Sequence, residues 1–287
     1  MFVKKLTQAN SAYPSLLRSI PNPPKQLFFL GSPPSDWDDK PKVAIVGSRH
    51  VTPYGKQVAE KFSRELAEQG VCIISGLALG IDAIAHQAAL SVGGGHIAVL
   101  PTGLKTIYPA TNRNLAAKLI EHGGCIVSEF DDTTPSLKHT FILRNRIVSG
   151  MADALLIIEA AEKSGTLHTA RFALEQGKDV LVVPGNITSP NSAGTNTLIK
   201  SGAIPVTSSA DILEALHLQS GLTAAFRHKS QEPHEQILLD ILYSGTTDGH
   251  ELLQLSKLSA ADYTTALTML ELSGKIKPLG SNHWATL

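Results

Sequence analysis

The chain has few of the residues that mark a specialised chemistry or compartment. Only two cysteines occur among its 287 residues. Cys72 and Cys125 each lie inside an apolar segment, so a disulfide framework or a thiolate metal site is disfavoured and we expect both thiols to fill the core. Lysine and arginine number 25, as do aspartate and glutamate, and the formal net charge is zero. Any nucleic-acid binding must therefore depend on a local basic patch.

Long hydrophobic runs are also missing. Residues 1–17 lack the apolar stretch of a signal peptide, and no later stretch is long and apolar enough to span a bilayer. We therefore expect a cytoplasmic protein with no membrane partner. No Ser-His-Asp order, carboxylate pair or Cys/His cluster stands out, so the sequence predicts no catalytic set, no metal and no cofactor.

The composition is otherwise that of a globular protein, with 43% hydrophobic residues. From Val43 onward, short β-branched runs alternate with helical segments, which predicts an α/β fold with a parallel sheet covered by helices on both faces. In the helical segment 55–69, Val58, Phe62 and Leu66 recur four apart on one face. The expected strands are 43–46, 71–75, 96–100, 125–128, 154–158, 180–183 and 204–206.

The chain divides by composition into four segments. Residues 1–42 are rich in proline and aromatics and predict an irregular arm packed on the core. Residues 43–218 form the main domain. Residues 219–232 are polar and aperiodic, as in a linker, and 233–287 predict three helices followed by a two-stranded hairpin, the arrangement of a winged helix.

The most informative stretch is 141–170. Arg144-Asn145-Arg146 precedes the apolar strand 154–158, and Lys163-Ser164-Gly165-Thr166 follows that strand and opens a helix. We expect free N–H groups and the positive end of the helix dipole to make an anion site there. Arginine can hold phosphate through two parallel hydrogen bonds, and Lys138 would add charge. The alternative is a solvated helix face with a capping serine.

Other glycine- and hydroxyl-bearing turns also follow strands. Gly47-Ser48-Arg49 follows the first strand, where the sequence departs from the G-x-G-x-x-G pattern and makes NAD binding improbable. Ser75-Gly76 begins a second such turn. Since the carboxyl ends of parallel strands lie at one edge of a sheet, these turns predict a shared phosphate pocket. Asp82 and His86 could be read as a ligand pair, but a helix-start carboxylate with a core histidine is the simpler interpretation.

These ordered motifs resemble the DprA (Smf) family of DNA-processing proteins over nearly the whole chain. The resemblance rests on Gly47-Ser48-Arg49, Ser75–Asp82, Tyr108-Pro109, Ser128-Glu129, Arg144-Asn145-Arg146, Ser164-Gly165-Thr166, Pro184-Gly185 and Gly194-Thr195-Asn196. Two departures occur. Ile142 stands where the family usually has proline, and Pro101-Thr102-Gly103-Leu104-Lys105 replaces the usual Gly-x-Gly-Leu-Asp.

The resemblance implies an extended Rossmann-like domain that binds single-stranded DNA, forms a homodimer and loads the RecA recombinase during natural transformation, without being an enzyme. It puts forward Arg49, Arg144 and Arg146 for DNA binding, with Lys138 and Lys163 as weaker candidates. Phe141, Tyr108 and His139 are the candidates for stacking on bases. The full expected DNA site is Gly47, Ser48, Arg49, Ser75, Gly76, Lys138, Phe141, Arg144, Asn145, Arg146, Lys163, Ser164, Gly165 and Thr166.

Two other functions remain as alternatives. The architecture is similar to that of phosphoribohydrolases, nucleotide-binding enzymes that carry a catalytic glutamate in the loop after this strand. Here Thr169 stands at that position, so the main agent of that chemistry is missing. A transcription factor acting through the winged helix is the other, but the stretch that leads into its third helix has few cations.

Overall fold

The computed structural model describes residues 2–132, 134–218, 230, 232–243, 246–280 and 282–286. The chain divides into two compact units, Met1–Ser220 and Gly221–Leu287. Of the expected linker 219–232, residues 219–229 and 231 lie outside the described residues. No described helix is both long enough and apolar enough to cross a membrane.

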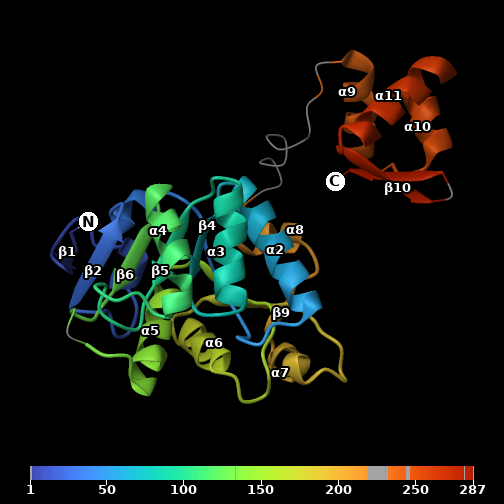
Figure 1. Ribbon diagram of the computed structural model, residues 1–287. Helices are drawn as coiled ribbons and strands as arrows, with labels where there is room; N and C mark the ends of the chain where they lie inside the picture. Colours follow the sequence, from blue (N-terminus) through green and yellow to red (C-terminus); the bar gives the residue numbers. More distant parts are fainter. Residues whose placement is uncertain are drawn as a thin grey trace. The chain divides into compact units, whose positions relative to one another are not determined.

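The first unit is built on a nine-stranded sheet (Figure 1). Its order is β1-β2-β6-β5-β4-β3-β7-β8-β9, and the run from β6 to β9 is parallel throughout. All seven expected strands are confirmed, each end to within one residue. Their bounds are β3 Lys42–Val46, β4 Cys72–Ser75, β5 His96–Val99, β6 Cys125–Ser128, β7 Ala154–Ile157, β8 Asp179–Val182 and β9 Ile204–Pro205.

Residues 1–42 pack on the core, but they are more regular than the arm expected from the sequence. Two strands, β1 Lys4–Thr7 and β2 Gln26–Gly31, extend the sheet, and β2 pairs antiparallel with β6. Leu27 and Phe29 bury one side of β2. The prolines that suggested an irregular arm lie around the short helix α1 Ser15–Arg18 and in the 3₁₀ helix η1 Pro34–Trp37, where no ladder hydrogen bond is required of them.

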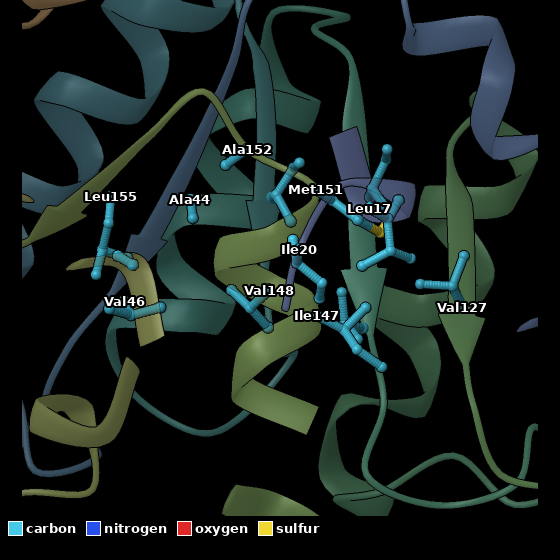
Figure 2. Close-up of a cluster of buried hydrophobic side chains, with 14 of the residues drawn as sticks. Leu17, Ile20, Ala44, Val46, Val127, Ile147, Val148, Met151, Ala152 and Leu155 are labelled. Atoms are coloured by element: carbon cyan, nitrogen blue, oxygen red, sulfur yellow. The ribbon is translucent and has the colours of Figure 1, made fainter. Parts of the chain in front are cut away.

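Helices cover both faces of the sheet, as expected. Strand β3 shows this directly, because Val43 and Ile45 pack with α2 Pro53–Glu68 and α3 Ile81–Ser91. Ala44 and Val46 point to the opposite face, where they join the cluster of α5 Lys138–Gly150 and α6 Thr166–Glu175 (Figure 2). Such two-sided burial explains why these strands are continuously apolar. The remaining elements are η2 Ala110–Asn112, α4 Arg113–Glu121, η3 Pro190–Ser192, α7 Ala193–Lys200 and α8 Ser209–Ala215.

The strand order fixes where a ligand site belongs. The chain starts the parallel sheet at the central strand β3, adds β4, β5 and β6 on one side, and then returns to add β7, β8 and β9 on the other. The carboxyl ends of β3 and β7 therefore meet at the point where the order reverses. Open α/β sheets bind their ligands in the crevice at this point.

The second unit has the expected winged-helix elements. They are α9 Pro233–Tyr243, α10 Gly249–Ser256, α11 Ala260–Leu272, β10 Ile276–Gly280 and β11 His283–Thr286, with β10 and β11 antiparallel. The side chains of Asp248 and Ser259 cap α10 and α11. Leu239, Leu252 and Leu270 are fully buried in a core of its own.

A buried arginine ties α5 to the sheet. The Arg144 side chain is 4% exposed, and its Nη1 donates to Gly76 O at 2.5 Å and Val99 O at 2.6 Å, at the carboxyl ends of β4 and β5. Burial lowers the pKa of Arg144 to about 10. The Asp82 carboxylate accepts from Gly76 N–H at 3.1 Å. Burial raises the pKa of Asp82, and the charge of Arg144 opposes that rise.

We expect Arg144→Met to lower the free energy of unfolding by about 3 kcal/mol or more, because two buried carbonyls and the Asp82 carboxylate lose their cation. Urea unfolding followed by circular dichroism measures the change. In a double-mutant cycle with Asp82→Asn, part of the loss should be recovered. A loss below about 1 kcal/mol for Arg144→Met would contradict this role.

His86 on α3 should make stability depend on pH. Its side chain is fully buried, and burial, assisted by nearby His96, lowers its pKa from 6.5 to about 3. Below pH 6.5 His86 becomes protonated in the unfolded chain but stays neutral in the folded protein. The free energy of unfolding therefore falls as the pH drops toward 3. His86→Gln should remove this contribution, which amounts to about 2 kcal/mol near pH 5. Urea unfolding at about pH 7.5 and about pH 5 measures it.

The matched control is His122→Gln, because that ring is exposed and its removal leaves the core untouched. The same pH dependence in both variants would contradict the assignment to His86.

Candidate nucleic-acid interface

A cleft of about 710 Å³ lies at the carboxyl ends of β3 and β7. It is bounded by the loop after β3, the first turns of α5 and the turn that precedes α6. Most of the residues expected from the sequence lie in it, namely Gly47, Ser48, Arg49, Lys138, Phe141, Arg144, Asn145, Lys163, Ser164, Gly165 and Thr166. The structure therefore brings together segments that are more than a hundred residues apart along the chain.

The loop after β3 is shaped by its glycine and serine. A Cβ on Gly47 would lie 2.7 Å from Ile81 Cγ1, so α3 packs directly against the backbone there. The Ser48 hydroxyl donates to His50 O at 2.9 Å and accepts from His50 N–H at 3.1 Å. The Thr166 hydroxyl donates to Gly47 O at 3.2 Å and joins this loop to α6. The loop is thus fixed while Arg49 stays exposed.

Arg49 stacks on one ring of an aromatic pair at one side of the cleft. Its guanidinium carbon lies 5.3 Å from the centroid of the Phe141 ring. Phe141 in turn meets Tyr108 edge to face, with centroids 5.4 Å apart and an interplanar angle of 77°. The same three residues, with Gly76, line a small notch of about 40 Å³ that adjoins the cleft. Cation and ring faces are therefore presented together, which suits a ligand with both phosphate and base.

Helix α5 presents one face to the cleft. Lys138, Phe141 and Asn145 are three and four residues apart, so they lie on the same side of the helix and all line the cleft. Arg144 reaches it from below, with a guanidinium largely buried against the sheet. Arg144 and Arg146 are two residues apart on the helix, so their side chains point in nearly opposite directions.

Arg146 does not line the cleft, so the expectation that it lies there beside the other cations is wrong. It forms an ion pair with Glu129, and its Nη1 donates to Asn22 O at 2.7 Å. Burial raises the pKa of Glu129, which the Arg146 charge opposes. Ser75 is also absent from the cleft lining, because its buried hydroxyl donates to Ile45 O at 2.6 Å and joins β4 to β3.

The turn before α6 is satisfied internally. The N–H groups of Thr166, Leu167 and His168 donate to Ser164 Oγ, Ser164 O and Gly165 O at 3.2, 3.1 and 3.2 Å. The expectation that free N–H groups point at a ligand is therefore wrong for these three. Full positive charge at this side of the cleft comes from the exposed side chain of Lys163.

The carboxylates near the cleft accept hydrogen bonds from the protein itself. Asp82 accepts from the N–H groups of Gly76 and Ala78. Glu159, which is 2% exposed, accepts from the Thr52 N–H at 3.1 Å and from the Thr52 hydroxyl, at the N-terminus of α2. Thr169 lines the cleft, so the position of the phosphoribohydrolase glutamate faces this site without a carboxylate. Among the described residues, no group of three or more His, Cys, Asp or Glu side chains could hold a metal.

Among the polar residues that line the cleft, the sequence reasoning missed His50, His168 and Asn191. His168 lies in the first turn of α6, so its position after a strand end was a usable signal. Asn191 lies in η3, far along the chain. Its Nδ2 donates to His50 O at 2.9 Å, and no sequence pattern pairs it with the loop after β3.

The winged-helix unit offers little positive charge. In winged and other helix-turn-helix domains that read DNA, a recognition helix enters the major groove. The corresponding helix α11 contains Asp262 and Glu271 but no lysine or arginine. A transcription factor acting through this helix is therefore disfavoured.

Comparisons with known proteins agree on one family. Residues 4–217 match the family model of DNA recombination-mediator protein A, and 223–282 match the DprA winged helix domain. Protein Smf of Escherichia coli is 51% identical over 181 residues, covering 63% of this chain and 48% of that protein. DNA processing protein DprA of Streptococcus pneumoniae is 41% identical over 204 residues, 71% of each chain. The matched part thus spans about half the length of the Escherichia coli relative.

Two solved structures are also similar. DNA processing protein A from Streptococcus pneumoniae has a TM-score of 0.68 and 38% identity, over 74% of this chain and 73% of that one. DNA processing protein A from Helicobacter pylori, described as having a unique single-stranded DNA binding mode, has a TM-score of 0.67 and 34% identity, over 75% and 95% of the two chains. The protein therefore belongs to the DNA recombination-mediator protein A family, whose members are named DprA or Smf, as the motifs in its sequence predict.

Proposed function

We propose that the protein binds single-stranded DNA in the cleft between the ends of β3 and β7. The observation that carries the proposal is the stack of Arg49 on Phe141, which also contacts Tyr108, beside the exposed cations Lys138 and Lys163. Single-strand binders combine a cationic groove for the backbone with ring faces for the bases, and they have little sequence preference. A chain of zero net charge gains such a site only by concentrating its cations locally.

Membership of the recombination-mediator family supports a wider role that we also propose. As a recombination mediator, the protein would protect an incoming strand and load the RecA recombinase onto it, in natural transformation and in recombination. We further propose that it acts as a homodimer in the cytoplasm, where the recombinase works. The Helicobacter pylori relative is described as binding single-stranded DNA, which supports the binding of the incoming strand.

We propose that the protein binds nucleotides without releasing their bases, in contrast to a phosphoribohydrolase. Hydrolysis of the N-glycosidic bond in such an enzyme depends on a carboxylate that moves a proton or stabilises developing positive charge. Asp82 and Glu159 already accept hydrogen bonds from backbone N–H groups, and Thr169 is neutral. Incubation with nucleoside monophosphates should release no free base, whereas base release would support the phosphoribohydrolase alternative.

Binding should be salt-dependent and should require the cleft cations. In fluorescence anisotropy with a labelled oligothymidine, we expect Arg49→Ala and Lys163→Ala each to weaken binding by about fivefold to tenfold. The slope of log K against log salt should become less negative by about 0.7 for each phosphate that the variant no longer neutralises. Arg49→Lys should recover the charge but less of the stacking.

Lys118→Ala is the matched control, because Lys118 is an exposed cation on α4 that does not line the cleft. Equal losses of affinity in all three alanine variants would mean that overall charge, not the cleft, decides binding. Unchanged binding in Arg49→Ala/Lys163→Ala would move the site elsewhere on the molecule.

Delivery to the recombinase should depend on the same residues. Added to oligothymidine and RecA, the protein should shorten the lag before RecA hydrolyses ATP on the strand, while Arg49→Ala/Lys163→Ala should not. A shortened lag with the double variant would show that strand capture in the cleft is unnecessary for loading.

A further inference from the structure

Tyr54 presents a fixed ring at the same edge of the sheet. It lies in the first turn of α2, directly after the loop that carries Arg49, and it is 49% exposed. Its hydroxyl donates to Pro184 O at 3.0 Å, in the loop after β8. A ring whose polar end is anchored, while much of its surface stays exposed, can stack on a base with little loss of side-chain entropy.

The loop after β8 adds a second apolar side chain. Ile187, three residues beyond the Tyr54 contact, is 90% exposed. Its loop is held by hydrogen bonds on both sides. Gly185 and Asn196 exchange two, at 3.3 and 3.1 Å, and Asn186 Oδ1 accepts from the Thr188 N–H at 3.0 Å. A large aliphatic side chain in this setting can insert against unstacked bases.

A hydrogen bond connects the segment that carries Ile187 to the cleft. Asn191, from the same connection between β8 and α7, donates to His50 O at 2.9 Å, and both residues line the cleft. The loop that carries Ile187 is therefore joined to the loop that carries Arg49. The Arg49–Phe141–Tyr108 stack lies toward the ends of β4 and β5, whereas Tyr54 and Ile187 lie toward the end of β8, on the other side of the switch point.

We propose that Tyr54 and Ile187 form a second base-stacking platform, which holds nucleotides of a single strand beyond those bound in the cleft. The inference rests on the proposed function of the cleft and assigns the direction in which the strand leaves it. Neither side chain is charged, so the platform adds affinity without adding a phosphate contact.

The test compares two strand lengths. Wild type and Tyr54→Ala/Ile187→Ala are titrated with labelled oligothymidines of about 6 and about 20 nucleotides across a salt series. The short strand should bind both proteins equally. The long strand should bind the double variant about tenfold more weakly, with an unchanged slope of log K against log salt, since only stacking is removed.

Three variants act as controls. Ile187→Ala alone changes a side chain that is almost fully exposed, so its share of the long-strand effect is free of any folding effect. Tyr54→Phe keeps the ring and should bind the long strand better than Tyr54→Ala. Leu174→Ala removes another exposed apolar side chain, on α6 away from this edge, and should bind as wild type does.

Equal long-strand affinity in wild type and the double variant would overturn the platform and leave the cleft proposal standing. Equally weakened binding of both lengths would also overturn it, because the pair would then act on the cleft itself. If wild type binds neither length, the proposed function falls and the platform falls with it.

Discussion

The candidate site depends on the hydrogen bonds that the buried guanidinium of Arg144 donates to the sheet. This guanidinium donates to carbonyl oxygens at the carboxyl ends of β4 and β5, and Gly76 leaves it room, since a Cβ there would overlap its Nη1. Helix α5 is therefore held against the sheet at the edge where ligands bind. That placement presents Phe141 and Asn145 to the cleft. One buried cation, costly to desolvate, thus positions side chains that remain accessible.

Helical geometry divides the Arg-Asn-Arg triplet among three tasks. Arg144 points to the sheet and Asn145 to the cleft. Arg146 contacts Asn22 O of the N-terminal segment and Glu129, which directly follows β6. Strands β1 and β2, added to the far side of β6, are consequently linked to the site through α5. A change in the N-terminal segment can reach the cleft by this route, although no described residue of that segment lines it.

The parallel sheet and most of the cleft were predictable because they follow from local pattern and topology. Apolar runs mark the strands, and a glycine or hydroxyl after a strand end must lie at the ligand edge whatever the details of packing. Side-chain direction was less accessible. Ser75 and Arg146 were misplaced because their partners, Ile45 O, Asn22 O and Glu129, are distant in sequence. Strand β2 was missed because neighbouring prolines outweighed its short alternation of Leu27 and Phe29.

The carboxylates nearest the cleft are held by hydrogen bonds within the protein. A negative charge on Asp82 or Glu159 opposes the attraction of Lys138 and Lys163 for a phosphate. Asp82 accepts hydrogen bonds from the backbone N–H groups of Gly76 and Ala78. Glu159 accepts one from the N–H of Thr52, at the N-terminus of α2. Both sets of donors partly offset the charge of the carboxylate. The same hydrogen bonds, with that from the Thr52 hydroxyl, engage Asp82 Oδ2 and both carboxylate oxygens of Glu159, which makes these atoms poorer general bases. The arrangement that tempers the negative charge beside the cleft thus also disfavours Asp82 and Glu159 as the base of a nucleotide-cleaving reaction.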